Sequence, residues 1–424
     1  MEREAGLKWL FLDLNSYFAS VEQQENPALR GKPVAVVPMM SNGTCAIAAS
    51  AEAKLYGVKT GTNVGDAKRM CPNLKLVQAR HDIYVAYHNR IIEETVKYTP
   101  INKIWSIDEL SSRLPPDKRS VGEATKVANR IKQGLWDNIG TSISCSIGIA
   151  PNSLLGKIAS DMKKPNGLTI IQQEDLPDAL FGLKLTDLPG IGHNMEIRLR
   201  RAGVTTIEQF WNISPKHARK IWGGVQGERF WYWIHGYDFE SPEQGNVMIG
   251  HSRVLDPHLR KPESARLMAR RLLVKASYRL RRKGYHAARL SLGVRTTAGY
   301  KWYQDATFAH ARDPFTFLEH LDALWAQMLS DFNGAQGMTF KKVSVILHNL
   351  KTSEELTGDL FSTINSAQTI RHKKQEALAN AMDSLQNKYQ KETVWLGVTP
   401  KTLAGHVGTK IAFARVPDAE EFWS

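Results

Sequence analysis

The amino-acid sequence predicts a multidomain protein of mixed α/β (α+β) class, and three observations lead to this prediction. The 424 residues are too many for a single hydrophobic core. In the first half, short apolar runs typical of strands alternate with stretches of helical periodicity. In the second half, residues 248–349 follow the order β-α-β-β-α-β, which predicts a ferredoxin-like module.

Composition narrows the classes of function. The formal charge of +14 and a pI near 9.5 favour an acidic partner, such as nucleic acid or an anionic membrane surface. The three cysteines lie far apart, which argues against a structural zinc site or a disulfide framework and fits a reducing cytoplasm. The N-terminus lacks the apolar core of a signal peptide, and no apolar run reaches the length of a membrane span. We therefore expect a soluble, cytoplasmic protein.

The first strand, residues 8–14, brings Asp13 to its carboxyl end, and a helix is expected from Asn15 to Glu22. Backbone N–H groups at the start of such a helix form a ready site for a phosphate. The aromatic residues Tyr17 and Phe18 lie beside this site. Either both belong to the core, or one of them packs against a nucleotide sugar; the sequence favours the core for at least one.

A second predicted strand, residues 101–107, leads into the adjacent carboxylates Asp108 and Glu109. An Asp-Glu pair after a short apolar run is most often a solvated strand end. Two strands that both end in carboxylates, however, can lie side by side in one sheet and bring Asp13 next to this pair. Like charges so close repel strongly, and a pair of divalent cations relieves the repulsion. This is the layout of a two-metal phosphoryl-transfer site.

Lysines lie near two predicted helix ends. Lys54 projects from a short helix over residues 51–57, within a compact insert at residues 31–80, and such a lysine is most commonly a solvated surface residue. Lys163 and Lys164 end a helix that begins at residue 151, because the proline after them stops it. These two lysines either neutralise the helix terminus or reach a triphosphate, if the helix points at the acids.

Residues 185–192 open a further module with Pro-Gly-Ile-Gly between two helical segments, which is a helix–hairpin–helix pattern. Gly190 and Gly192 leave backbone N–H groups uncovered, so a nucleic-acid phosphate can approach them without any contact to a base. A tight turn that contains glycine for steric reasons alone is the alternative. Residues 241–247, which follow this module, have the composition of a linker.

The ferredoxin-like module concentrates positive charge, with fourteen Lys and Arg against two acids over residues 251–301. In the strand over residues 287–296, apolar residues alternate with Arg289 and Arg295, so one face is apolar and the other cationic. We expect that face, with Arg253 from the preceding strand, to hold a phosphate backbone. A basic face without a partner is the alternative.

The tail, residues 351–424, is balanced, with nine basic and nine acidic residues, and is not expected to hold nucleic acid. Its segment Leu356 to Phe361 ends in a Leu-Phe pair, and residues 375–389 form an amphipathic helix. Short acidic and apolar segments of this kind dock into a groove on a partner or tuck into their own domain. The sequence favours neither.

Six short motifs then follow one another along the chain: Asp13-x-Asn-x-Tyr-Phe-Ala-Ser, residues 51–59, Ser-Ile-Asp-Glu at 106–109, Ser-Ile-Gly-Ile-Ala at 146–150, Lys-Pro-Asn-Gly at 164–167 and Leu-Pro-Gly-Ile-Gly at 188–192. This ordered set, within a match from about residue 8 to about residue 350, resembles the Y-family translesion DNA polymerases, in particular their UmuC/DinB-type bacterial members. The resemblance implies a right-hand polymerase, whose parts are a palm (1–16 and 83–173), fingers (17–82), a helix–hairpin–helix thumb (174–240), a linker (241–247), a little finger (248–350) and a tail (351–424).

The resemblance also implies a function: template-directed, low-fidelity DNA synthesis past damage, as in the SOS response, from a dNTP onto primer–template DNA. Two Mg²⁺ ions, for which Mn²⁺ is a substitute, are implied as cofactors, and a sliding clamp as a partner through Leu356–Phe361. The residues implied are the metal-binding Asp13, Asp108, Glu109 and the carbonyl of Leu14; the steric gate Phe18 beside Tyr17; the phosphate-binding Lys54 and Lys164; and the pocket floor around Cys45 and Ile47.

Some positions depart from the family's pattern. Ala51 and Lys54 stand where many members have Tyr and Arg, Asn15 replaces a frequent Asp, and the bulky Leu110 follows the Asp-Glu pair. These departures keep a second hypothesis open, a non-catalytic relative that acts as a DNA- and clamp-binding adaptor, although the three retained carboxylates argue against it. A nucleotidyl cyclase uses a similar palm but needs neither the helix–hairpin–helix nor the cationic module.

Overall fold

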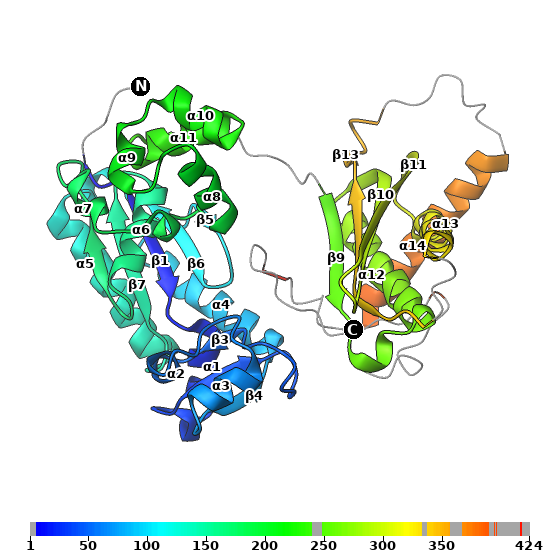
Figure 1. Ribbon diagram of the computed structural model, residues 1–424, viewed down its shortest axis with the longest axis horizontal. Helices are drawn as coiled ribbons and strands as arrows, with labels where there is room; N and C mark the ends of the chain where they lie inside the picture. The colour runs from blue at the N-terminus through cyan, green and yellow to red at the C-terminus, as the bar shows by residue number, and fades with distance from the viewer. Residues whose placement is uncertain are drawn as a thin grey trace. The chain divides into compact units, whose positions relative to one another are not determined.

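The computed structural model describes residues 6–239, 248–332, 337–356 and 367–389, together with residues 394, 396, 416 and 417. They belong to two compact units, the first of residues 1–240 and 409–422 and the second of residues 241–408 and 423–424, and each unit is described by itself (Figure 1). Within the described ranges, no helix combines the length and the apolar character that crossing a membrane requires. The linker predicted at residues 241–247 lies outside them.

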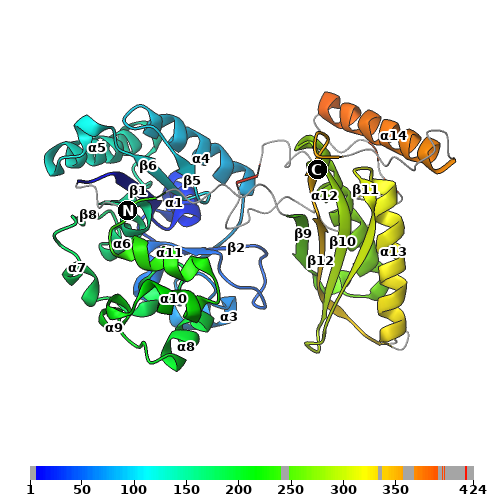
Figure 2. The same ribbon diagram turned by 90° about the horizontal axis from the view of Figure 1, so that it is seen from above.

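The first unit is built around a five-stranded sheet in the order β5-β6-β1-β7-β8. The central strand β1 runs antiparallel to both β6 and β7, and it is buried because helices cover both faces of the sheet. Helices α4 and α5 pack on one face and α6 on the other (Figure 2). The bounds are β1 Trp9–Leu14, β5 Lys103–Ile104, β6 Glu109–Arg113, β7 Cys145–Ala150, β8 Leu168–Ile170, α4 His81–Val96, α5 Val121–Gly134 and α6 Ser153–Met162.

Two glycines let α6 lie directly on β7. A Cβ added at Gly148 would lie 2.0 Å from the carbonyl oxygen of Gly156, so position 148 has no room for a side chain. The same helix is capped by Asn152, which is 1% exposed and whose side-chain oxygen accepts from the N–H of Leu155. Close packing and the cap together fix the position of α6 over the sheet.

The predicted insert is a small subdomain with a three-stranded sheet, β3-β2-β4. Its core consists of small residues, mainly alanines, so the backbones of its elements lie close together. The shortest of these strands is β3, which consists of Ala48–Ala49. The bounds are α1 Tyr17–Glu25, β2 Val34–Val37, α2 Ala51–Leu55, α3 Val64–Met70 and β4 Lys75–Gln78.

A group of short helices completes the first unit and shares one apolar core with α6. The amide group of Asn152 donates to the carbonyls of Trp233 and Tyr237, which ties the last of these helices to the start of α6. The helical segment before the Pro-Gly-Ile-Gly turn is short, a 3₁₀ turn at Leu185–Asp187. The bounds are α7 Asp178–Phe181, α8 His193–Arg201, α9 Ile207–Asn212, α10 Pro215–Trp222 and α11 Val225–Ile234.

The second unit has the β-α-β-β-α-β order that the sequence predicts, with its sheet in the order β11-β10-β12-β9. Apolar residues of the strands pack against α12 and α13, which leaves the opposite face of the sheet uncovered by these helices (Figure 2). The bounds are β9 Met248–Val254, α12 Pro262–Arg282, β10 Tyr285–Thr296, β11 Lys301–Ala311, α13 Pro314–Asp331, β12 Phe340–His348 and β13 Lys351–Thr352.

The tail contributes the helix α14, Ala367–Tyr389, which is longer than the predicted amphipathic segment. It is attached to α12 by a bidentate ion pair between Arg281 and Asp383, with N···O distances of 2.7 Å, and by a hydrogen bond from Tyr278 to Asn387. Of the proposed clamp peptide only Leu356 lies within the described residues.

Candidate active site

The three carboxylates meet where two antiparallel strands adjoin. Asp13, near the end of β1, pairs directly with Glu109, the first residue of β6. The prediction that both acids follow strand ends is therefore wrong: β5 is only two residues long, and the acids lie at the end of one strand and the start of its antiparallel neighbour. Antiparallel pairing still brings these two ends to the same edge of the sheet.

A tight loop holds Asp108 beside this pair. The backbone N–H groups of Trp105 and Ser106 both donate to the carbonyl oxygen of Glu109, at 2.9 and 3.3 Å. The carbonyl of Asp108 accepts from the N–H of Leu14 at 2.8 Å, which anchors the loop to the end of β1. The positions of all three acids are thus fixed by backbone hydrogen bonds.

The acids are poorly solvated. Asp13 is 5% exposed. Burial raises the pKa of Asp108, and the nearby charge of Asp13 raises it further, against a hydrogen bond from Ser106 that lowers it. Burial also raises the pKa of Glu109, against the positive charge of Lys157. Both ionised carboxylates therefore gain from any further positive charge that comes close.

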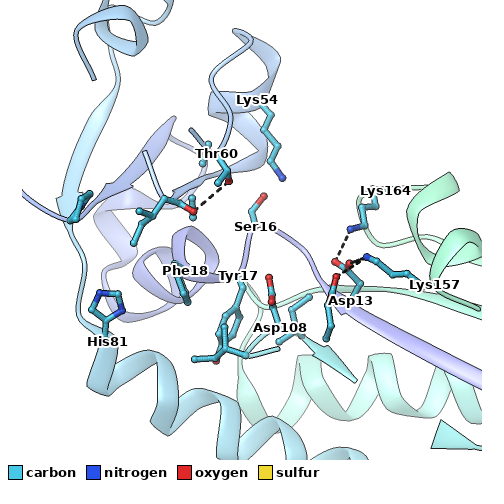
Figure 3. A pocket seen from close by; sticks show the side chains of 17 residues that line it. Asp13, Ser16, Tyr17, Phe18, Lys54, Thr60, His81, Asp108, Lys157 and Lys164 are labelled. Atoms are coloured by element: carbon cyan, nitrogen blue, oxygen red, sulfur yellow. Dashed lines mark hydrogen bonds and ion pairs between the residues drawn. The ribbon is translucent and has the colours of Figure 1, made fainter. Parts of the chain in front are cut away.

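Two lysines provide part of that charge. Lys157 of α6 places its Nζ 2.5 Å from Asp13 Oδ2 and 2.8 Å from Glu109 Oε1. Lys164, just beyond α6, places its Nζ 2.7 Å from Asp13 Oδ1 (Figure 3). Lys164 is among the residues expected from the sequence, whereas Lys157 is not. The only local signal for it is the neighbouring Gly156, which marks the side of α6 that approaches the sheet.

A cavity of about 360 Å³ opens beside the acids. Figure 3 shows Asp13, Asp108 and the two lysines on one side, with Lys54 opposite them on α2. Burial and the charge of Lys164 lower the pKa of Lys54, although Asp13 opposes this shift. Three lysines and three acids thus line one cavity, and the lysines give it a place for an anion next to the carboxylates. The remaining lining is Leu14, Ser16, Tyr17, Phe18, Pro38, Ile47, Ala48, Ala49, Thr60, His81 and Ile107.

The structure separates the roles of the two aromatic residues. Tyr17 is 3% exposed and its hydroxyl donates to the carbonyl of Tyr84 at 2.7 Å, so it is a core residue that only touches the cavity. Phe18 is half-buried, and its ring stacks on Tyr84 with centroids 4.4 Å apart. Of the pair, Phe18 is the residue whose ring is held as a wall of the cavity.

Replacing Tyr17 by Phe should lower the free energy of unfolding by about 1 kcal/mol, because the change removes one buried hydrogen bond and little else. Urea unfolding followed by circular dichroism measures this loss. Tyr56→Phe is the control, since Tyr56 is 54% exposed. An equal loss in both variants would contradict the structural role of the Tyr17 hydroxyl.

The chemical nature of the ligand atoms in this site suits divalent cations. Asp13, Asp108 and Glu109 offer only oxygen ligands, which Mg²⁺ prefers, and their poor solvation favours an added positive charge. In the conformation described here, the residues that the structure covers contain no group of three acid, histidine or cysteine side chains already close enough to hold a metal. Lysines instead hold both oxygens of Asp13. The three carboxylates can therefore bind divalent cations once Lys157 and Lys164 move away from Asp13.

Comparisons with known proteins show which family the chain is related to. The chain matches the model of the impB/mucB/samB family over residues 12–161, the DNA polymerase-iota thumb domain over residues 186–238, and the impB/mucB/samB C-terminal domain over residues 247–360. DNA polymerase IV 1 of Bacillus subtilis is 32% identical over 299 residues, which are 67% of this chain and 69% of that relative. DNA polymerase IV of Moorella thermoacetica is 29% identical over 401 residues, 92% of this chain and 95% of that relative.

Among solved structures, a Y-family DNA polymerase chimera of Dbh and Dpo4 superposes with a TM-score of 0.70 at 22% identity, and the match covers 82% of this chain and 100% of that one. The chain belongs to the Y-family of translesion DNA polymerases. The family explains why the two units occur in one chain, since family models match both of them.

Two departures from the Y-family pattern have a structural account. Leu110 is 3% exposed and pairs with Leu12 in the core, so it points away from the acids and does not crowd them. Asn15 is 7% exposed; its side chain donates to Ser146 and accepts from the N–H of Asn166, which holds the loop that carries Lys164. On the pocket floor, Ile47 lines the cavity as expected, whereas Cys45 lies outside it.

The predicted DNA-binding residues of this Y-family chain differ in their surroundings. Gly190, with φ at 94°, and Gly192 are exposed on the turn before α8, as a phosphate contact requires. Arg253 is largely buried and pairs with Asp256 at 2.8 Å, and Arg289 pairs with Asp305 at 2.6 Å. Both arginines thus already have a carboxylate partner, and their assignment as DNA-binding residues stays a prediction.

Arg295 is exposed and belongs to a row of cations. It pairs in register with Lys301 on β11 and with Lys342 on β12, so the three side chains share the face that α12 and α13 leave uncovered. Much of the remaining charge of residues 251–301 lies instead on α12, where Arg266 and Arg270 pair with Asp322. The cationic face of the sheet is thus narrower than the sequence suggests.

Proposed function

We propose that this chain extends a primer along a template, damaged templates included, by nucleotidyl transfer from a dNTP at Asp13, Asp108 and Glu109. The observation that carries the proposal is the cavity in Figure 3, where these acids face Lys54 across a space also lined by Lys164. Carboxylates beside lysines suit a reaction in which a hydroxyl attacks a triphosphate and pyrophosphate leaves.

We assign cation binding to the acids and triphosphate binding to the lysines. Asp13, Asp108, Glu109 and the carbonyl of Leu14 would hold two divalent cations, Mg²⁺ or in its place Mn²⁺. These ions, when bound, favour the ionised form of the primer hydroxyl and offset the charge of the leaving group. Lys54 and Lys164 bind and orient the triphosphate, because their ammonium groups lie on the cavity wall beside the acids.

Small side chains on the opposite wall account for tolerance of damaged templates. Ile47, Ala48, Ala49 and Thr60 line the cavity on the side of the α1–β4 subdomain. Alanines leave room above a new base pair, so a pair of unusual shape is not rejected by contact alone. Discrimination between correct and incorrect bases is correspondingly weak.

The row Arg295, Lys301 and Lys342 would hold the DNA backbone by charge. Arg295→Gln and Lys342→Gln should each weaken primer–template binding. Each should also make the negative slope of the logarithm of the association constant against log salt shallower by about 1. Fluorescence anisotropy over a salt series measures this slope. Arg266→Gln removes the same charge from α12, where the side chain pairs with Asp322, and should leave the slope nearly unchanged. Equal slopes in all three variants would exclude the row as the DNA contact.

Primer extension tests the proposed function. The full-length protein, with Mg²⁺ and four dNTPs, should lengthen a labelled primer on an undamaged template and past a template abasic site. Tight binding of primer–template without extension, with or without a sliding clamp, would favour the adaptor function instead.

Docking to a clamp through Leu356–Phe361 is a proposal that rests on the resemblance. Deletion of residues 356–361 tests it by clamp pull-down.

A further inference from the structure

One acid near the site belongs to neither strand. Asp161 lies one turn beyond Lys157 on α6 and three residues before Lys164. Its Oδ1 accepts from both lysines, at 3.0 Å from Lys157 Nζ and 2.8 Å from Lys164 Nζ. Both ammonium groups therefore bridge Asp13 and Asp161.

This arrangement conflicts with metal binding. Each oxygen of Asp13 contacts one ammonium group, and Lys157 also holds Glu109. A divalent cation bound to Asp13 and Glu109 would face one or two positive charges at contact distance, where repulsion is strong. The lysines must leave these carboxylates before the ion can take their place.

Only the side chains are free to make this change. The backbone of α6 is fixed by the close contact of Gly156 with Gly148. The loop that carries Lys164 is fixed by the bond from the N–H of Asn166 to Asn15 and by Lys132, whose Nζ donates to the carbonyls of Asn166 and Gly167. A lysine side chain has a flexible four-carbon stem, so its ammonium group can turn from one carboxylate to another without backbone motion.

We propose that Asp161 is a positioning residue that retains Lys157 and Lys164 when divalent cations displace them from Asp13 and Glu109. The proposal rests on the proposed function, because it assigns the ions to these carboxylates. Asp161 is more exposed to solvent than Asp13, with side-chain exposures of 35% and 7%, so it holds the lysines away from the buried acids. Asp161 thus keeps one carboxylate partner for both lysines after the ions take Asp13 and Glu109.

The test measures Mn²⁺ binding to the full-length protein by electron paramagnetic resonance, without DNA or nucleotide. Asp161→Asn should weaken Mn²⁺ binding by about tenfold, because the lysines lose their second partner and remain on Asp13. Lys157→Gln should strengthen it, because a competing cation is gone. In the Lys157→Gln/Lys164→Gln background, Asp161→Asn should change the affinity less than about threefold, since no lysine is left to retain.

The control is Glu123→Gln, which removes a similar acid from the pair with Lys126 on α5 and should not alter Mn²⁺ affinity. Thermal unfolding establishes that each variant is folded. An equal loss of affinity on Asp161→Asn in both backgrounds would overturn the proposal, as it would show a general effect of charge. Weaker binding in Lys157→Gln, or no Mn²⁺ binding by the native protein, would overturn it as well. Because the measurement needs no primer extension, loss of polymerase activity is a separate result.

Discussion

The double substitution Asp108→Asn/Glu109→Gln should lower the rate of primer extension by at least about a thousandfold, the largest effect expected of any change in this chain. Both substitutions keep the size of the side chain and the backbone bonds that fix the loop at Ser106 and Leu14. They remove two negative charges that the divalent cations require. The expected loss is therefore one of chemistry and not of folding.

Single-turnover extension of a labelled primer measures this rate, and fluorescence anisotropy shows whether DNA still binds. Glu123→Gln/Asp137→Asn is the matched control: it removes the same charge from α5 and from the turn that follows α5, where neither residue lines the cavity. Extension that survives in the Asp108/Glu109 variant would place the reaction elsewhere and overturn the proposed site.

The second large effect is expected at Phe18. Replacing it by Ala should raise the efficiency of ribonucleotide relative to deoxyribonucleotide incorporation by about a hundredfold. The ring is held from two sides, stacked on Tyr84 and edge-on to His81 with centroids 6.2 Å apart, so it cannot move away from a 2′-hydroxyl that approaches it. Removing the ring opens that space.

Competition between rNTP and dNTP in primer extension gives the ratio. Tyr17→Phe is the control on the neighbouring residue, since it alters the core and leaves the wall of the cavity in place. Phe18→Ala also removes packing, so Phe18→Leu, which keeps part of the volume, should give an intermediate ratio. A folded Phe18→Ala protein that still excludes ribonucleotides would show that another residue forms the gate.

The three carboxylates of the candidate site could be predicted from the sequence alone. Asp13, Asp108 and Glu109 could be singled out because two separate apolar runs each end in acids, and sheet pairing brings Asp13 next to Glu109. The position of the second strand was wrong. The apolar residues between Ile101 and Ile107 suggested a strand before the acids, whereas backbone hydrogen bonds to the carbonyl of Glu109 close a loop there and the strand begins at Glu109.

Residues whose role depends on tertiary contacts were harder to predict. Lys157 is one lysine on an amphipathic helix, and only the packing of that helix on β1 and β7 turns it toward the acids. The ion pair of Arg253 was not predicted either, because its partner Asp256 lies beyond the strand and is brought back by the turn that follows. The order of elements in the second unit was predicted well, because its strands alternate and its helices are long.

The shared core of α6 and the short helices after it has a consequence for how this enzyme can change in evolution. Asn152 fastens the last of those helices to the same α6 that carries Lys157, and the apolar core runs through both without a break. The proposed DNA-binding turn before α8 and the proposed catalytic cavity are therefore inherited together. Exchange of the short helices between relatives would disturb the cavity, whereas the second unit, with a core of its own, is the module that recombination can replace.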